Sequence, residues 1–138
     1  MIRSGERVFV DTGAWIALAL VQDPMHGRAK EIWDTLQEAG ARTFVSVPVL
    51  LETFTYLQRK VSQDVATLWW ESLGAVRFLD RLECSPIELG AAMKFLARRD
   101  LHKLSLVDAT SFLLMKKHKL RVAFAFDVHF STAGFRLA

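Results

Sequence analysis

Four acidic side chains occupy positions from which they could form a single chemical site. Asp11 and Asp127 each directly follow a short apolar run of the kind that forms a buried strand. Open α/β sheets bind ligands beyond the carboxyl ends of their parallel strands, so both carboxylates are expected at one edge. Asp108 lies near the start of a predicted helix beside that edge, and Glu52 lies in the second turn of another. The sequence therefore predicts four carboxylates that meet at one end of one sheet.

Carboxylates gathered in this way repel one another, so the cluster needs a compensating cation. Mg²⁺ and Mn²⁺ prefer oxygen ligands, retain several waters and bridge carboxylates to phosphate groups. One ion can lower the pKa of a bound water to generate a nucleophile, and a second ion about 3.5–4 Å away can stabilise the leaving oxygen. The cluster therefore indicates hydrolysis of phosphodiester bonds, with the number of ions left open.

Each acid also has a purely structural interpretation. Asp11 could cap the helix that follows it, and Asp127 could organise a turn. Asp108 could close a capping box with Ser105, where its charge would also favour the start of a helix. Glu52 could belong to an ordinary polar face of its helix. These interpretations compete with the metal site residue by residue.

The elements that must position these residues alternate between strand and helix. Strands are predicted over residues 7–10, 43–47, 82–85 and 121–126. Helices are predicted over residues 14–21, 26–37, 48–60, 64–78, 86–99 and 105–118. This alternation is typical of an α/β domain with a mostly parallel sheet, because parallel neighbours need crossover connections. The tail from 131 to 138 has no clear pattern.

Length and composition exclude several classes of protein. A chain of 138 residues with 51% hydrophobic and 24% charged residues is expected to fold as one domain over residues 1–138. Its longest apolar run, 14–21, is far shorter than the roughly 20 residues of a membrane span, and its start lacks a signal-peptide core. We therefore expect a cytoplasmic protein without a membrane partner. The single cysteine, Cys84, forms no zinc motif, so any metal must be held by oxygen.

The net charge of +3 is unevenly distributed. Residues 94–121 contain eight Lys and Arg but only two Asp, so this segment carries +6 and the rest of the chain −3. Such a segment can bind a polyanion such as RNA, although a solvated helix face explains the same charges. The candidate RNA-binding cations are Arg98, Arg99, Lys103, Lys116 and Lys117.

Four short motifs, in order, resemble the PIN-domain family, and in particular the VapC-type toxins of toxin–antitoxin pairs. Residues 8–13, VFVDTG, resemble the opening strand with its first acid and following hydroxyl residue. Residues 47–52, VPVLLE, resemble the block that carries the glutamate. Residues 104–109, LSLVDA, and 125–130, AFDVHF, resemble the blocks of the third and fourth acids. The specific signal is the presence of all four at PIN-like separations across nearly the whole chain.

This resemblance implies a three-layer α/β/α sandwich, dependence on Mg²⁺ with Mn²⁺ as a substitute, and endonucleolytic cleavage of RNA. The metal-binding acids would be Asp11, Glu52, Asp108 and Asp127. Thr12 and Ser105 would be hydroxyl residues that orient water or a carboxylate. The implied partners are an RNA substrate, a cognate antitoxin protein and a second copy of the chain.

One segment departs from the family pattern. Relatives often place an acid close before the serine, whereas this chain has His102 and Lys103 before Ser105. The difference could alter contacts with the substrate without removing the metal site.

Two other families that gather aspartates at strand ends do not fit. A receiver-type phosphoacceptor domain needs an acidic pair after its first strand, and a haloacid-dehalogenase-type phosphatase needs an acid two residues after its nucleophile. Here Thr12 and Gly13 follow Asp11. The remaining alternatives are a PIN nuclease of RNA processing and a non-catalytic PIN scaffold that binds RNA or protein.

Five further side chains have two interpretations each. Four tryptophans lie in amphipathic helices, where core packing is expected: Trp15, Trp33, Trp69 and Trp70. The alternative is a groove around Trp33 and Trp69 that accepts an antitoxin helix or a dimer partner. His129 is expected to pack in a turn, with contact to a substrate phosphate as the alternative.

Overall fold

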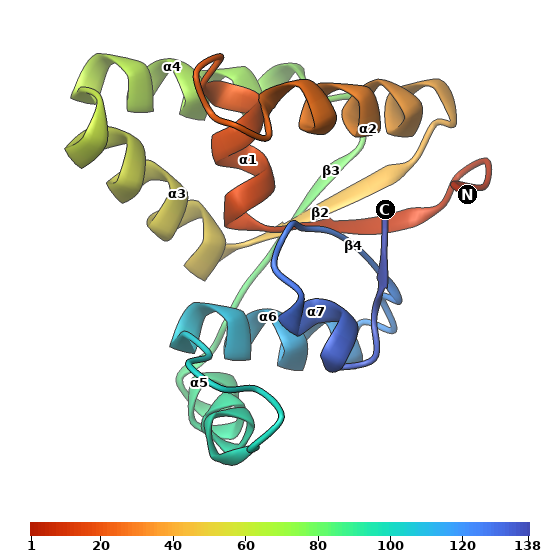
Figure 1. Ribbon diagram of the computed structural model, residues 1–138, viewed down its shortest axis with the longest axis vertical. Helices are drawn as coiled ribbons and strands as arrows, with labels where there is room; N and C mark the ends of the chain where they lie inside the picture. Colours follow the sequence, from red (N-terminus) through yellow and green to blue (C-terminus); the bar gives the residue numbers. More distant parts are fainter.

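The computed structural model describes all 138 residues and contains one five-stranded sheet (Figure 1). The strands are β1 (Arg7–Val10), β2 (Arg42–Ser46), β3 (Leu79–Leu82), β4 (Val122–Phe124) and β5 (Arg136–Leu137). Their order is β3-β2-β1-β4-β5, and every neighbouring pair is parallel. The predicted α/β class with a parallel sheet is confirmed.

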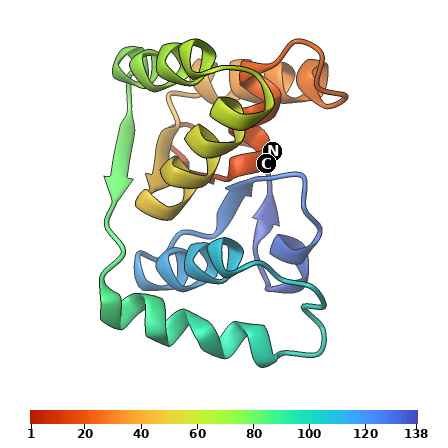
Figure 2. The ribbon, with the colours of Figure 1, turned by 90° about the vertical axis from the view of Figure 1, so that its left-hand side faces the viewer.

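Helices cover both faces of the sheet and complete the expected three-layer sandwich. They are α1 (Thr12–Ala19), α2 (His26–Glu38), α3 (Val47–Lys60), α4 (Gln63–Ser72), α5 (Pro86–Ala92), α6 (Leu106–Lys117) and α7 (His129–Thr132). Short 3₁₀ turns follow α4 and α5, at Leu73–Ala75 and Met93–Ala97. Figure 2 shows α1 to α4 in one layer and α5 to α7 in the other, with β3 leading from the first layer to the second. No helix has the length and apolarity needed to cross a membrane.

The core lies on both faces of the central strands. Val8, Phe9 and Val10 of β1 are fully buried, as expected where helices cover both sides of a parallel sheet. Between α6 and α7, the rings of Phe112 and Phe130 meet edge to face with centroids 4.9 Å apart. This contact fixes the two helices that carry Asp108 and His129 relative to each other.

Serine caps begin the helices around the acidic residues. The Ser46 hydroxyl accepts a hydrogen bond from the Val49 N–H at 3.3 Å, and Pro48 lies in the first turn of α3. The Ser105 hydroxyl accepts from the Asp108 N–H at 3.1 Å and begins α6. Local sequence therefore sets where each helix starts along the sheet edge.

Several predicted boundaries of strands and helices are wrong. The strand predicted over 82–85 lies at Leu79–Leu82, because this edge strand has the sequence LDRL, whose charged centre hides the strand pattern. The helix predicted over 64–78 ends at Ser72, and the one predicted over 86–99 ends at Ala92. In both cases a 3₁₀ turn continues the chain beyond the α-helix.

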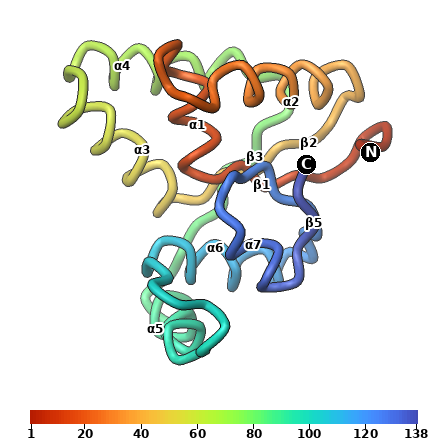
Figure 3. Tube along the Cα trace, viewed as in Figure 1, coloured from red at the N-terminus to blue at the C-terminus, as the bar shows by residue number.

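The last part of the chain holds two elements that the sequence did not predict. Strand β5 makes only two pairs with β4, Val122 with Arg136 and Ala123 with Leu137, and both of its residues are exposed. Helix α7 is a single four-residue turn. Figure 3 traces this end of the chain from β4 through α7 to β5.

The tryptophans divide between the core and the surface. Trp15 and Trp69 are buried, and their ring centroids lie 6.1 Å apart. Together with the half-buried Trp33 they line a hollow of about 540 Å³ between α1, α2 and α4. Trp70 is 45% exposed, so the prediction of core packing is wrong for this residue. It lines a separate hollow between α3 and α4, together with Leu51 and Phe54.

Candidate metal centre

Asp11 lies at the junction of β1 and α1. Its backbone N–H donates to the Phe124 carbonyl of β4 at 3.0 Å, which extends the pairing of the two central strands to the acid itself. The residue is 5% exposed and occupies the N-cap position of α1. Its side chain nevertheless makes no capping hydrogen bond, and its buried Oδ1 has no partner. The capping interpretation therefore fails, and a buried carboxylate oxygen is left uncompensated, which is costly.

The charge on Asp11 is strongly disfavoured without a cation. Burial is the largest cause that raises its pKa, to about 8, and the next is repulsion from the Asp108 carboxylate. Glu52 and Asp127 raise the pKa further, against one backbone hydrogen bond that lowers it. Four acids from four separate segments therefore share one electrostatic environment.

The Asp108 carboxylate does not complete a capping box at the start of α6, although a hydrogen bond from the Ser105 side chain lowers its pKa. Helix α5 has a complete capping box, in which the Glu88 carboxylate accepts the Ser85 N–H at 2.9 Å. In α6 only the bond to the Ser105 hydroxyl forms, without the reciprocal bond from the carboxylate. Burial raises the pKa of Asp108 to about 6, followed in size by repulsion from Asp127 and Glu52. The carboxylate is therefore not used in the capping box that the sequence offered as an alternative.

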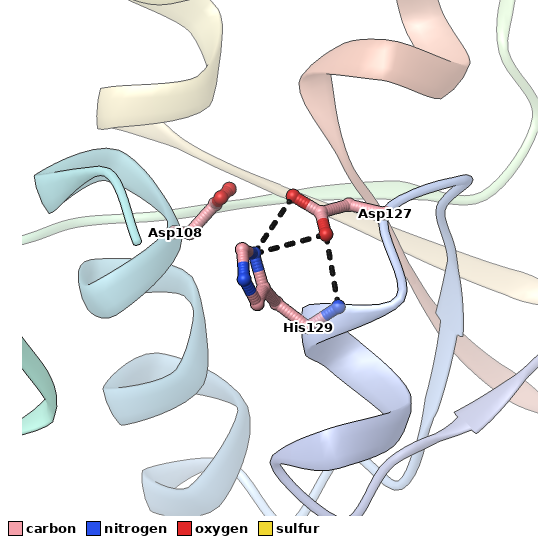
Figure 4. A group of neighbouring side chains, drawn as sticks. All are labelled: Asp108, Asp127 and His129. Atoms are coloured by element: carbon pink, nitrogen blue, oxygen red, sulfur yellow. Dashed lines mark hydrogen bonds and ion pairs between the residues drawn. The ribbon is translucent and has the colours of Figure 1, made fainter. Parts of the chain in front are cut away.

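Asp127 both organises a turn and faces the acidic cluster (Figure 4). Its Oδ1 accepts the His129 backbone N–H at 2.9 Å, as the structural interpretation expects. The His129 Nδ1 lies 3.0 Å from Oδ1 and 3.2 Å from Oδ2 of the same carboxylate. One ligand atom each from Asp108, Asp127 and His129 lies within 4.8 Å of the others, close enough to share an ion. The two interpretations of Asp127 are thus compatible.

His129 joins the cluster through its ring. The sequence placed it in a turn, and the turn exists, but the imidazole turns toward Asp127 (Figure 4). The signal that could have found it is the Asp-x-His spacing, since the turn that binds the backbone N–H also brings the side chain back to the carboxylate.

Glu52 approaches from the opposite layer. It is half-buried on α3 and lines a hollow of about 560 Å³ together with Thr55, Tyr56 and the α6 residue Val107. Its negative charge raises the pKa of both Asp11 and Asp108, but its carboxylate, like that of Asp11, lies outside the tight group of ligand atoms. Of the four acids, Glu52 alone lines this hollow between α3 and α6.

The two predicted hydroxyl residues differ in their surroundings. Thr12 is buried beside Asp11, and its Oγ1 has no hydrogen-bond partner. Ser105 is exposed, and its hydroxyl is occupied as the cap of α6. Thr53, next to Glu52 on α3, is a further buried threonine with an unpartnered Oγ1 that the sequence analysis did not single out. Buried hydroxyl groups without partners favour a site that holds water or a ligand.

The basic segment contains both neutralised and free cations. Arg98 donates to Asp100 through Nε at 2.9 Å, and Lys117 pairs with Glu88 at 2.5 Å. The other three candidates, Arg99, Lys103 and Lys116, are exposed and form no ion pair. Arg98 and Lys117 therefore fit the interpretation of a solvated helix face. Arg99, Lys103 and Lys116 have no acidic partner and remain candidates for binding RNA.

Residues 8–136 match the PIN domain, and the chain belongs to this family. It is also 37% identical over 131 residues to the 23S rRNA-specific endonuclease VapC20 of Mycobacterium tuberculosis, a match that covers 93% of this chain and 95% of that protein. The crystal structure of VapC20, described as a sarcin-ricin loop cleaving toxin, superposes with a TM-score of 0.81 at 34% identity over 93% of this chain and 95% of that one. The resemblance to VapC-type toxins is confirmed.

More distant structures share the fold. VapBC2 of Rickettsia felis superposes with a TM-score of 0.71 at 10% identity, over 96% of this chain and 97% of that one. VapBC of Salmonella typhimurium gives a TM-score of 0.64 at 18% identity, again over 96% and 97% of the two chains. The three-layer arrangement is thus retained where little sequence similarity remains.

Proposed function

We propose that this protein is a metal-dependent endoribonuclease, the toxin of a toxin–antitoxin pair, whose acidic cluster binds Mg²⁺ or Mn²⁺. The observation that carries the proposal is the buried Asp11 carboxylate, which has an unpartnered oxygen and three other acids around it. Neither capping nor an ion pair explains why the fold buries that acidic side chain. A hard divalent cation with oxygen ligands compensates it.

The proposed ligands are Asp11, Glu52, Asp108 and Asp127. When bound, a divalent cation supplies positive charge that activates a water molecule and stabilises the charge of the scissile phosphate. His129 holds the Asp127 carboxylate from the side through its backbone N–H and its ring. A second group that fixes a ligand in this way is common around metal sites. Thr12, with its free buried hydroxyl, is proposed to orient water beside Asp11.

The same residues govern protons at the site. In the absence of a cation, the raised pKa keeps Asp11 protonated up to about pH 8, and Asp108 up to about pH 6. At neutral pH the Asp11 carboxyl would therefore have to give up its proton to bind a cation. The positive charge of a bound cation would offset the mutual repulsion of the charged carboxylates.

We propose ribosomal RNA as the substrate class. The curated relative with 37% identity is named as a 23S rRNA-specific endonuclease, and the solved relative as a sarcin-ricin loop cleaving toxin. Both matches cover 93% of this chain, and the PIN match over residues 8–136 includes all four acids. Among the predicted RNA-binding cations, Arg99, Lys103 and Lys116 are free to bind phosphate. An rRNA substrate requires action in the cytoplasm, in agreement with the sequence-based expectation.

The proposed protein partners are a cognate antitoxin and a second copy of the chain. The apolar hollow lined by Trp15, Trp33 and Trp69 is suited to the apolar face of an antitoxin helix. For the second copy, α3 and α4 offer the exposed side chains of Leu51 and Trp70, which are 65% and 45% exposed.

The proposal is tested by cleavage of 23S rRNA and of a short sarcin-ricin hairpin with purified, antitoxin-free protein. We expect cleavage at one site with Mg²⁺ or Mn²⁺, none in EDTA, and recovery when the metal is restored. Cleavage that persists in EDTA overturns the metal dependence. Binding of RNA without cleavage under any metal condition identifies the protein as a non-catalytic scaffold instead.

A further inference from the structure

The edge of the sheet opposite the acids is lined with arginine. Arg7 begins β1, Arg42 begins β2, Arg136 begins β5, and Arg121 directly precedes β4. Because all the strands are parallel, these side chains lie at the amino ends of the strands, whereas the acids follow the carboxyl ends. Figure 3 shows the amino-terminal segment, the end of α6 and β5 on this side of the molecule.

Two adjacent hollows at this edge share a set of cations. One hollow, of about 310 Å³, lies between the amino-terminal segment and the α6–β4 turn, and the other, of about 550 Å³, lies between that turn and β5. Lys119 and Arg121 line both. The basic edge is defined by the six cations of the two hollows: Arg3, Arg7, Lys116, Lys119, Arg121 and Arg136.

The positive charge of the basic edge is almost uncompensated. The only acid in either hollow is Glu6, and it pairs with Arg136. The other five cations form no ion pair. Arg7 is held in place without losing its charge, because it donates to the His118 carbonyl at 3.1 Å and lies over the Phe44 ring. The basic edge therefore carries a net positive charge, and Arg7 is the cation whose position is fixed by its contacts.

Lys119 occupies a position where its backbone is poorly suited to lysine. It follows the end of α6 with φ +56°, a left-handed conformation that usually selects glycine. The turn is closed by the Lys119 N–H to the Lys116 carbonyl at 3.2 Å and by the Leu120 N–H to the Met115 carbonyl at 2.8 Å. These backbone hydrogen bonds do not involve the lysine side chain, and glycine would adopt this conformation more easily. The turn alone therefore does not account for a lysine at this position.

The dipole of α6 accounts for only some of the cations at the basic edge. Cations near the carboxyl end of a helix are stabilised by its dipole, which covers Lys116 and Lys119. Arg3, Arg7 and Arg121 lie outside α6, in the amino-terminal segment and beside the starts of strands. A shared anionic ligand explains all five.

We propose that the basic edge binds the phosphate backbone of RNA at a second site, separate from the acidic cluster. This inference rests on the proposed function, because it assigns the edge to the same RNA substrate. The central strand β1 has four residues and spans about 13 Å, so a folded RNA of ribosomal size can contact both edges of the sheet. The acidic cluster would then act on one part of the RNA while the basic edge holds another.

The test compares the double variant Lys119→Gly/Arg121→Gln with the wild type in RNA binding at several salt concentrations, in EDTA. Removing two phosphate contacts should make the slope of log Kd against log salt shallower by about 1.5, and weaken binding of a 23S rRNA fragment about tenfold at low salt. The control is Arg28→Gln/Lys60→Gln, which removes the same charge from exposed positions on α2 and α3. It should leave the slope unchanged.

Two further measurements separate this inference from the proposed function and from misfolding. With Mg²⁺, the double variant should cleave a short hairpin at the wild-type rate, while its KM for the long RNA rises. RNA binding in EDTA measures the contribution of the basic edge even if the wild type cleaves no RNA. Lys119→Gly alone, which suits the turn, should melt no lower than the wild type and show about half the change in salt slope. A slope equal to that of the wild type in both variants overturns the inference.

Discussion

The two edges of the sheet carry opposite charges under opposite physical conditions. At the carboxyl edge, Asp11 is 5% exposed and its charge is opposed by burial and by other acids. At the amino edge, Arg121 and Lys119 are exposed, where a charge costs little. A buried carboxyl group with an unpartnered oxygen therefore points to a ligand by itself, whereas an exposed cation becomes informative only through its neighbours and its backbone.

The largest expected effect is at the acidic edge. Asp11→Asn retains the size of the side chain but removes a metal-binding charge, so RNA cleavage in Mg²⁺ should fall by at least about 100-fold, or about 2.7 kcal/mol. Asp34→Asn on α2, an exposed aspartate paired with Lys30 at 3.3 Å, is the matched control and should cleave at the wild-type rate. Equal rates for both variants would remove Asp11 from the site.

The second prediction concerns the stability of the metal-free protein. The folded-state pKa values of Asp11 and Asp108, about 8 and about 6, exceed the ordinary value of 3.8, so the folded protein holds protons that the unfolded chain releases. The contribution of these two groups to the free energy of unfolding is therefore most favourable near pH 4 and decreases as the pH rises to 8.

Asp108→Asn should remove part of this loss of stability at high pH and stabilise the protein in EDTA at pH 8 by about 1–3 kcal/mol. Adding Mg²⁺ should raise the melting temperature of this variant less than that of the wild type. Thermal melts at pH 5 and pH 8, with EDTA and with Mg²⁺, measure both changes. A lower melting temperature in EDTA, with an undiminished shift on adding Mg²⁺, would mean that Asp108 acts as a helix-end charge only.

A smaller effect is expected at His129, which orients a ligand without replacing it. His129→Gln should reduce cleavage about 10-fold, the lower range for residues that hold metal ligands, and weaken Mg²⁺ binding to a similar degree. Isothermal titration with Mg²⁺ and cleavage assays test the two together. Loss of cleavage with unchanged Mg²⁺ affinity would instead indicate contact with the RNA, the alternative that the sequence allows.

The smallest effect is at the basic edge. Because Lys119 has φ +56°, Lys119→Gly relieves a left-handed conformation and should stabilise the protein by about 1 kcal/mol or less. For a domain of this size the melting temperature then rises by about 2–4 °C at most. A decrease would show that the lysine side chain supports the fold, and would make the contrast between the two edges weaker.

The sequence reveals the acidic edge better than the rest of the molecule. Asp11 and Asp127 could be found because each follows an apolar run that both faces of a parallel sheet require. The burial of Asp11 and the direction of the His129 ring could not, since both depend on how β1, β4 and α7 meet in space. The roles of the acids as metal ligands stay predictions.

Edge strands were the least predictable elements. Strand β3 has charged residues at its centre, and β5 has two residues that make only two pairs, so neither has an apolar pattern of strand length. Their places depend on pairing with neighbours that are distant in the sequence. The basic edge escaped detection for the same reason, because its cations come from residues near 3, near 119 and near 136.

The sheet order also determines when the proposed acidic site can form during synthesis of the chain. Strand β1 pairs with β4, so the partner that completes the centre of the sheet is made more than 100 residues later. A growing chain that ends before Asp127 lacks one acid of the cluster, however well its first layer has folded. Under the proposed function, the chain is therefore inactive for most of elongation, and the cluster is complete only after β4 has emerged and paired.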